Sequence, residues 1–473
     1  MSTAEAVVAD PTRLTARLRA VVAVVILADV LDLMDSTITN IGAPTIVRDL
    51  GGGESLIKWL GASYSLALGV LLVVGGRLGD KYGKRRIFLI GIAGFTLSSL
   101  ACGLAADPVM LISARLVQGS FGALLIPQGI SILITALSRE QLPTVFSVFG
   151  PALGASAVLG PIVAGFIISA DIAGLTWRPM FLINIVLGSI GFIAAIRVLP
   201  HDQPEGNQEI DGVGAGLLGL SMLGLIYGLI EGSTSGWTAI PVMSLIVGAG
   251  AFGLFCVRQR TAENPLIIPS LLTNRGFTSG LLLGLIYFAA VNGFAYVLSL
   301  FFQLQLHLTS LQASFGLSPL MVGIIVASLF ARPLIPKLGR KLVVAGLAMS
   351  LAGAVGIYVT VLAVGGQVNA FWTVPSVFVL GVGMGTSIAS IYDVAIGDVA
   401  PEEAGSASGS LSAVQQLAAA IGSAVVTTVY FSQAAAHGGI HAVTVSVVVA
   451  GAIIAICLGV VWLLPKAAPD EQH

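Results

Sequence analysis

The chain consists of long apolar runs separated by short polar turns, which is the pattern of helices that cross a lipid bilayer. A helix needs about 20 mostly apolar residues to cross the hydrocarbon core, and fourteen runs satisfy this requirement. They lie near residues 20–44, 57–79, 86–105, 108–136, 145–169, 179–199, 213–231, 239–257, 277–301, 316–335, 341–364, 371–396, 405–431 and 440–464. We therefore predict an all-α polytopic membrane protein with 14 transmembrane helices.

The longest polar stretch away from the termini, residues 201–211, separates the sixth run from the seventh. Six predicted helices precede this stretch and eight follow it, which indicates two six-helix bundles and one extra helical pair. The predicted arrangement is 6+2+6. The N-terminal bundle covers residues 1–200, the linker and the extra pair cover 201–258, and the C-terminal bundle covers 259–473.

The segment after the ninth run has a different pattern. Residues 302–309 alternate between polar and apolar with a period of two, which is typical of a strand. With residues 312–315 as the return strand, the segment would form a short β-hairpin outside the membrane. An extension of the ninth helix accounts for the same residues equally well, and both alternatives stay open.

Composition and charge agree with a membrane location. Hydrophobic residues make up 56% of the 473 residues, charged residues only 10%, and the mean hydropathy is +0.98. The net charge is −1 and no basic stripe is present, so we expect the lipid bilayer as a partner and no nucleic acid. The three cysteines lie in apolar runs without metal-ligand spacing, and no glycine-rich phosphate loop occurs, so we expect no metal, no cofactor and no enzymatic activity.

The distribution of Lys and Arg predicts the orientation. An even number of spans places both termini on one side, and positive loops favour the cytoplasm. With a cytoplasmic N-terminus, 18 of the 22 Lys and Arg residues lie in the tails and inner loops. Only Arg48, Lys58 and Arg178 lie outside, and Arg115 lies within the fourth run. We predict a multi-pass protein of the plasma membrane with both termini cytoplasmic.

The first run contains three acidic residues, Asp29, Asp32 and Asp35. An acidic residue at the bilayer centre costs about 2.5–3.5 kcal/mol on insertion scales, so it commonly marks an ion or substrate pathway. A spacing of three residues places these side chains along one side of a helix, where they can face a common cavity. The alternative is that they only connect helices through hydrogen bonds. We favour a functional role for Asp32 and Asp35 and leave both readings open for Asp29.

Arg115 is the one basic residue deep within a predicted span. At the helical rise, Arg115 lies about 10 Å below the outer end of its run, and Asp35 lies about 13 Å below the outer end of the first run. The similar depths predict a buried pair in which protonation of the carboxylate controls where the arginine points. A static structural ion pair is the alternative. No histidine lies deep in a span, so proton coupling would have to use carboxylates.

The turn between the second and third runs, residues 76–86, carries five basic residues and one acid. We name it the latch loop. Glycines permit a tight turn, cations hold the loop in the cytoplasm, and the acid is left facing other helices. We interpret it as a conformational latch, whereas a simple topology anchor would account for the cations alone. The residues assigned to the latch are Gly76, Asp80, Lys81, Gly83 and Arg85.

Small residues recur along the fifth run, among them Gly154, Gly160, Pro161 and Gly165. Small side chains let another helix approach closely, and a proline within a helix removes a backbone hydrogen bond and permits a bend. Generic close packing is the alternative explanation.

Together these segments resemble the major facilitator superfamily and, within it, the drug:proton antiporters with fourteen spans. The resemblance covers nearly the whole chain, but its specific motifs lie in the first half. The latch loop resembles the signature between the second and third spans, with Lys81 where arginine is usual. Residues 33–44 are similar to the first-span motif of the fourteen-span branch.

Three further segments carry the resemblance. Residues 115–119 resemble the fourth-span motif linked to proton coupling, and the fifth run resembles the antiporter motif with Ala164 in place of a usual glycine. Residues 177–184 also resemble this branch, although Pro179 replaces a common aromatic residue. The antiporter motif favours export over uptake.

The resemblance implies a proton-coupled exporter of amphipathic, cationic drugs or antibiotics that works by alternating access. Asp35 would couple the proton together with Asp32 and Arg115, and both acids would line the substrate cavity with Gln118 and Asp29. The small drug-like substrate and protons would be its soluble partners, and we expect a monomer. A carrier of one specific metabolite or antibiotic, whether exporter or symporter, and a receptor without transport are the alternatives.

The resemblance also implies how the latch works. Asp80 would bind the positive N-terminus of the thirteenth span, after residues 398–403, with Arg85 orienting its carboxylate. Asp393, near the inner end of the twelfth span, would be a second acid on the exit path or a member of the acidic inner loop.

Overall fold

The described part of the chain is helical throughout. A computed structural model describes residues 14–138, 141–202, 211–331, 334–365, 369–396, 399 and 404–465, and none of these lies in a strand. The first eight helices are α1 (Ala16–Leu50), α2 (Gly53–Tyr82), α3 (Lys84–Gly103), α4 (Pro108–Ala136), α5 (Leu142–Ala170), α6 (Pro179–Val198), α7 (Gly212–Ser235) and α8 (Ala239–Thr261). The remaining long helices are α10 (Arg275–Leu300), α11 (Ser310–Ala331), α13 (Arg340–Val364), α14 (Ala370–Ile396), α15 (Ala404–His437) and α16 (Gly439–Val460). Short helical turns comprise Ile172–Gly174, α9 (Pro269–Thr273), α12 (Ile335–Leu338) and Val461–Leu463.

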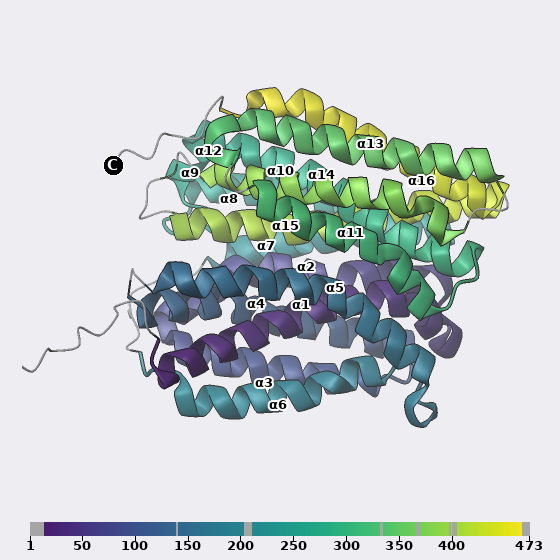
Figure 1. Cartoon of the computed structure of the whole chain (residues 1–473). Helices are drawn as coiled ribbons and strands as arrows, with labels where there is room; N and C mark the ends of the chain where they lie inside the picture. The colour runs from purple at the N-terminus through teal and green to yellow at the C-terminus, as the bar shows by residue number, and fades with distance from the viewer. Residues whose placement is uncertain are drawn as a thin grey trace, which may run out of the picture.

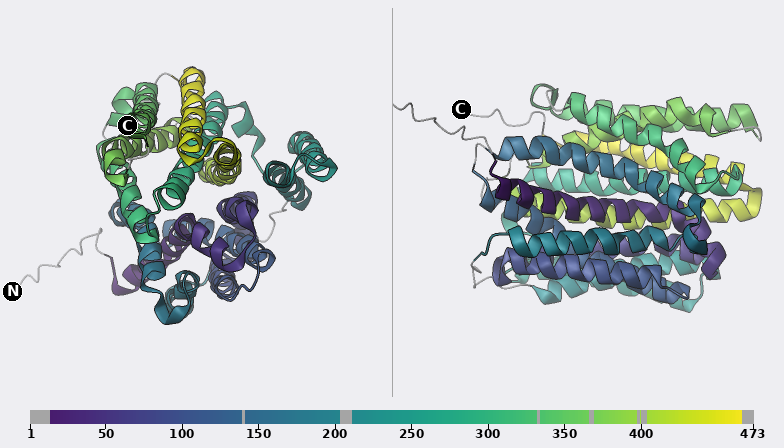
Figure 2. Two further views of the ribbon diagram at one scale, coloured as in Figure 1. Left: turned by 90° about the vertical axis from the view of Figure 1, so that its right-hand side faces the viewer. Right: turned by 60° about the horizontal axis from the view of Figure 1, so that its bottom comes forward.

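The long helices lie side by side in two groups (Figure 1). Helices α1 to α6 form one group and α10 to α16 the other, and the view along the helix axes shows α7 and α8 as a pair at one side (Figure 2, left). This pair packs on α2 and α15, one helix from each group. One large apolar core contains residues from both groups, including Ile38 of α1 and Leu298 of α10.

Two ends of the molecule can be distinguished. We name the end where α2 turns into α3 at Gly83 the latch end, and the opposite end, where α1 turns into α2 at Gly51 and Gly52, the far end. Helix α1 begins at the latch end, and α16 ends there, on the left in Figure 1.

Twelve helices within the described residues are long and apolar enough to cross a membrane, which makes the chain a multi-pass membrane protein. The predicted number of fourteen is not supported by this criterion. Helix α1 has 35 residues, but its aspartates interrupt the apolar stretch, and of α5 only Leu159–Ala170 qualifies, as a shorter apolar helix.

The predicted hairpin at residues 302–315 is wrong, and the helical extension is confirmed. Helix α10 continues into a π-helical turn, Phe301–Gln305, and α11 begins after a turn in which His307 has φ +51°. The polar side chains find partners within the helical ends, since Gln303 Nε2 donates to Ser299 Oγ at 3.2 Å and Ser310 Oγ donates to Gln303 Oε1 at 3.3 Å. The alternation therefore reflects polar residues at a helix end, and not a strand.

Hydroxyl groups of the second group of helices bond backbone carbonyls of the first group in the half of the molecule near the far end. Tyr296 donates to Ile57 O at 2.6 Å, and Ser299 Oγ donates to Asn40 O at 2.8 Å. Asn40 lies four residues before Pro44, whose nitrogen carries no hydrogen, so the carbonyl of Asn40 has no helical donor. Ser299 thus donates to a carbonyl oxygen that the proline of α1 leaves without a helical donor.

The α7–α8 pair is attached to α2 at both ends. At the latch end, Arg77 donates to Asn264 O at 3.3 Å and to Pro265 O at 2.5 Å, just after α8. Towards the far end, Lys58 Nζ donates to Ser233 Oγ at 2.8 Å and to Thr234 Oγ1 at 3.0 Å. Lys58 is only 1% exposed, and the hydroxyls of α7 supply acceptors for its buried ammonium group.

Candidate functional site

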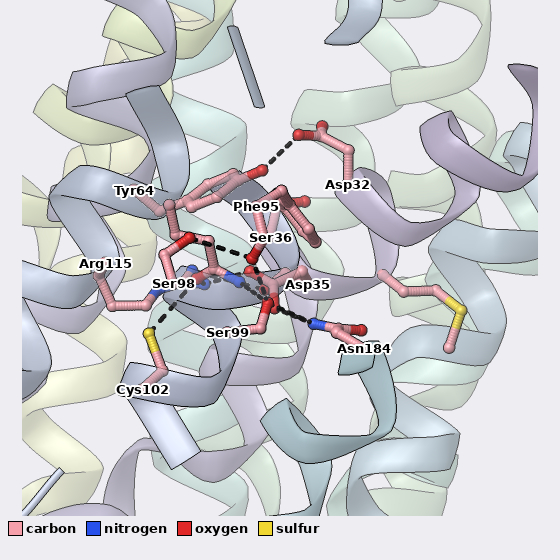
Figure 3. Close-up of polar contacts among 12 residues, drawn as sticks. Asp32, Asp35, Ser36, Tyr64, Phe95, Ser98, Ser99, Cys102, Arg115 and Asn184 are labelled. Carbon is pink, nitrogen blue, oxygen red and sulfur yellow. Dashed lines mark hydrogen bonds and ion pairs between the residues drawn. The ribbon is translucent and has the colours of Figure 1, made fainter. Parts of the chain in front are cut away.

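The structure brings Asp35 of α1 and Arg115 of α4 together in an ion pair, with both side chains at most 1% exposed (Figure 3). Arg115 Nη1 donates to Asp35 Oδ2, and Asn184 Nδ2 of α6 donates to Asp35 Oδ1 at 2.7 Å. Both oxygens of this carboxylate therefore accept a hydrogen bond. A charge-assisted pair with such support is costly to break, by about 3–5 kcal/mol when one partner is removed.

Gln118 and Ser99 extend this pair into a network across α1, α3, α4 and α6. Gln118 Oε1 accepts from Arg115 Nη1 at 2.8 Å, and its Nε2 donates to Ser99 Oγ at 2.7 Å. Ser99 Oγ also accepts from Asn184 Nδ2 at 3.3 Å. Gln118 is fully buried, so in this structure it binds its neighbours in the network. The Arg115 guanidinium lies 4.4 Å from the centre of the Tyr64 ring, where the aromatic face further stabilises the cation.

Asp32 has a separate partner on α2. The Tyr64 hydroxyl donates to Asp32 Oδ1, as Figure 3 shows, and the carboxylate is 2% exposed. Helix α4 passes this pair at Gly122, where a Cβ atom would lie 2.6 Å from Asp32 Oδ1 and 2.8 Å from the Tyr64 hydroxyl. Only glycine leaves room for the pair at this position.

Asp29 differs from the other two acids. Its side chain is 4% exposed, and its Oδ1 has no hydrogen-bond partner among the described residues. A Cβ atom at Gly129 of α4 would lie 3.7 Å from Asp29 Oδ1, so this carboxylate also faces a glycine of α4.

The three acids therefore follow the seam between α1 and α4, and we name them the carboxylate ladder: Asp35, Asp32 and Asp29. Successive members are separated by about 4.5 Å along the helix axis. Since α1 begins at the latch end, Asp29 is the member nearest to that end.

The latch loop is fixed to α6 through its backbone. Gly83 ends α2 with φ +96°, a conformation that favours glycine. The Asp202 carboxylate, beyond α6, accepts from the N–H groups of Lys84 and Arg85. Lys81 lies with its ammonium 5.6 Å from the ring of Tyr82.

The described contacts of Arg85 do not include Asp80. Its guanidinium donates to Ile196 O at 2.7 Å and contacts His201 Nε2 at 3.1 Å, both on the side of α6. The expected role of Arg85 in orienting Asp80 has no support in these contacts. Residues 400–403, which lead into the predicted partner of Asp80 at the start of the thirteenth span, lie outside the described residues, and so does the side chain of Asp393.

Helix α4 packs closely on the end of α2 that leads into the latch loop. Gln128 is 1% exposed, and its Nε2 donates to Gly75 O at 2.7 Å. A Cβ atom at Gly79 would lie 1.7 Å from Gln128 Oε1, and one at Gly76 would lie 3.7 Å from Pro127. The glycines of this segment thus allow direct contact between α2 and α4.

The small residues of α5 face α1 and α11. A Cβ atom at Gly160 would lie 2.4 Å from Thr37 Oγ1 of α1, and one at Gly165 would lie 2.6 Å from Ser314 Oγ of α11. Ser314 Oγ also donates to Pro161 O at 2.6 Å. Gly154 lies in the same helix, but its surroundings fall outside the described residues.

The sequence did not assign a role to Asn184, Ser99 or Tyr64 around the acids. The signal that was available for Asn184 and Ser99 is a polar residue within an apolar run, which needs a partner when it is buried. Within the described residues, no three His, Cys, Asp or Glu side chains gather as metal ligands.

Sequence comparison identifies the family. The pattern that defines the Major Facilitator Superfamily matches residues 25–423. The chain belongs to the Major Facilitator Superfamily. This superfamily consists of membrane transporters, which are not enzymes.

Several relatives are named for antibiotics. The chain is 38% identical over 421 residues to the "Probable actinorhodin transporter" of Streptomyces coelicolor, covering 88% of this chain and 73% of that protein. It is 30% identical to the "Puromycin resistance protein pur8" of Streptomyces alboniger, covering 94% and 89%. It is 28% identical to the "Tetracenomycin C resistance and export protein" of Streptomyces glaucescens, covering 83% and 72%.

Solved structures of other transporters share the fold. A POT family transporter in complex with 5-aminolevulinic acid has a TM-score of 0.67 at 14% identity, covering 93% of this chain and 95% of that chain. The nucleoside transporter NupG has a TM-score of 0.61 at 14% identity, covering 95% and 98%. At such identities the likeness shows the fold alone.

Proposed function

We propose that the chain is a proton-coupled exporter of amphipathic drugs or antibiotics, a drug:proton antiporter of the plasma membrane that works by alternating access. The observation that carries the proposal is the fully buried Asp35–Arg115 pair. Titratable charge in a membrane segment commonly marks an ion or substrate pathway. The antibiotic resistance and export proteins among its relatives support an antibiotic as cargo.

In this mechanism a proton and a cationic substrate compete for the acids of α1. Protonation of Asp35 removes the charge that holds Arg115, and loss of the proton restores the pair. Asp32 and Gln118 contribute to the same substrate and proton site. Proton entry from outside would displace the substrate outward, and proton release inside would prepare the site for the next substrate.

The proposal uses fourteen spans in the arrangement 6+2+6. Helices α1 and α5 have 35 and 29 residues, long enough to cross a bilayer, and together with the other twelve they would give fourteen spans. The two six-helix bundles would rock about the site, with α7 and α8 as the extra pair. Basic residues of the latch loop favour a cytoplasmic latch end, which places both termini in the cytoplasm. One chain contains the whole site, so we propose a monomer.

The latch and the small residues of α5 would control the motion. Asp80, with Gly76, Lys81, Gly83 and Arg85 shaping the loop, would bind the N-terminus of α15 and stabilise one state of the carrier. Gly154, Gly160, Pro161 and Gly165 would form the antiporter motif. The close approaches of α1 and α11 to α5 support this role.

An exporter of a single antibiotic is a second candidate. Each of the three relatives above is named for one antibiotic, which favours a narrow range of substrates.

The test is transport by the purified protein in proteoliposomes under an imposed proton gradient. Puromycin, tetracenomycin C and the lipophilic cation tetraphenylphosphonium serve as probes. We expect gradient-driven movement of at least one probe, its loss in Asp35→Asn, and its retention in the control Glu263→Gln, an exposed acid. Movement of one antibiotic alone supports the narrow exporter. Absence of gradient-driven movement, or wild-type transport by Asp35→Asn, contradicts the proposal.

A further inference from the structure

Asp29 is a buried carboxylate without a full set of hydrogen bonds. Its side chain is 4% exposed, and Oδ1 has no partner in the described part of the chain. Asp35 differs, because Arg115 and Asn184 donate to its two oxygens. An ionised carboxylate is costly to bury unless it is paired, whereas the protonated form is not charged. Within the carboxylate ladder, Asp29 is therefore the member that gains most from binding a proton.

Among the described residues, the charged neighbour of Asp29 lies on its own helix. Asp32, one turn along α1, is the charged group that acts on it. Tyr64 of α2 is bonded to Asp32, and Arg115 of α4 is bonded to Asp35, so neither neutralises Asp29. Helix α4 faces Asp29 at Gly129. The other side chains near this glycine are uncharged, namely Val25 of α1 and Phe88 of α3.

The polar groups continue from Asp29 towards the latch loop. Gln128 precedes Gly129 on α4, is 1% exposed, and donates to Gly75 O. Its amide oxygen lies where a Cβ atom of Gly79 would be, within the latch loop. The carboxylate ladder and Gln128 together thus form a line of polar groups from the Asp35–Arg115 ion pair to the part of α2 beside Asp80.

We propose that Asp29 is the proton-release residue of this carrier. The proton that Asp35 carries passes to the carboxylate of Asp32, and from Asp32 through one bridging water to the carboxylate of Asp29. At each step the O–H bond of the donor breaks and a new O–H bond forms on the acceptor. Asp29 then releases the proton towards the latch end, and Asp32 and Asp35 are left ionised for the next substrate. This inference rests on the proposed proton-coupled export, and it gives Asp29 a task distinct from substrate binding.

The experiment compares two modes of transport by Asp29→Asn in proteoliposomes. Efflux driven by an imposed proton gradient requires release of the proton, whereas exchange of labelled for unlabelled substrate across the membrane does not. We expect gradient-driven efflux to fall by roughly 100-fold, as when a proton-transfer group is removed, and substrate exchange to stay near the wild-type rate. Asp29→Glu should restore part of the gradient-driven efflux.

The outcomes separate this inference from the proposed function. Wild-type gradient-driven efflux by Asp29→Asn overturns it, and so does equal loss of efflux and exchange, which would indicate a role in packing or substrate binding. Intact exchange shows that the variant is folded. If the wild-type protein shows no gradient-driven efflux, the proposed function fails and the inference falls with it, a result visible before any variant is compared.

Discussion

At the scale of single residues, the site depends on how completely each buried carboxylate is hydrogen-bonded. Asp35 accepts from a guanidinium and an amide, Asp32 accepts from a phenol, and Asp29 has one oxygen without a described partner. This gradation gives three residues of the same type three different environments on one helix. Asn184 is as much part of the environment of Asp35 as Arg115 is.

Gly122→Ala tests the Asp32–Tyr64 pair by crowding it. The new Cβ atom would lie 2.6 Å from Asp32 Oδ1, so the carboxylate or the phenol must move. Overpacking of this kind costs about 1–3 kcal/mol, and we expect a lower thermal unfolding temperature in detergent together with reduced gradient-driven efflux.

The matched control is Gly250→Ala on α8, where the added Cβ atom meets nothing within 4 Å. Alanine is favoured over glycine within a helix by up to about 1 kcal/mol, so this variant should unfold at the same or a higher temperature. Equal behaviour of the two variants would show that the Asp32–Tyr64 pair tolerates displacement.

At the scale of elements, the apolar runs predicted the helices well, because the bilayer requires a continuous apolar length that a sequence displays directly. The similar depths of Asp35 and Arg115 predicted their contact, since the position along a helix fixes depth. Side-chain partners between distant helices were harder to predict. Lys58 reads as a cation at the outer edge of its apolar run, and the packing of α7 against α2 provides its acceptors.

Helix ends were also difficult to predict. The alternating residues after α10 fit a strand and a helix end equally. The hydrogen bonds of Gln303 to Ser299 and Ser310 are those of a helix end. The roles of the site residues, in contrast, stay predictions, because contacts in one structure do not measure transport.

The contact between α1 and α10 gives a prediction about opening at the far end. Ser299→Ala removes the donor to Asn40 O. This should destabilise the state in which α1 and α10 are in contact by about 1 kcal/mol, which shifts its population about fivefold. Spin labels at Val109 and Phe371, both exposed near the far end, should show a larger fraction of long distances in the variant.

Pro44→Ala provides the matching test, because alanine restores the N–H group that the Asn40 carbonyl lacks. In the Pro44→Ala background, we expect Ser299→Ala to have a much smaller effect on the distance distribution. Additive effects of the two substitutions would mean that the serine does not compensate for the proline.

At the scale of the whole molecule, the orientation follows from the positive residues and can be measured directly. Val109 lies near the far end and is 72% exposed, and Tyr82 lies at the latch end and is 46% exposed. With the far end outside, a cysteine at position 109 should react with a membrane-impermeant thiol reagent in intact cells, and one at position 82 should react only after permeabilisation. The reverse pattern would invert the proposed direction of transport.

The attachment of the α7–α8 pair to α2 has a consequence for how such carriers can be divided and recombined. If the chain is cut between Ile268 and Pro269, the hydrogen bonds that Lys58 and Arg77 make stay within the first fragment. The same holds for the hydrogen bond from Arg258 Nε, near the end of α8, to Asp211 Oδ1, just before α7. Of the hydrogen bonds described for the pair, the one between Ser233 and Thr428 crosses the break. The unit that can be exchanged between carriers is then eight helices, not six. Chimaeras joined between Ile268 and Pro269 should assemble, whereas a junction at residues 201–211 separates the α7–α8 pair from its hydrogen-bond partners on α2.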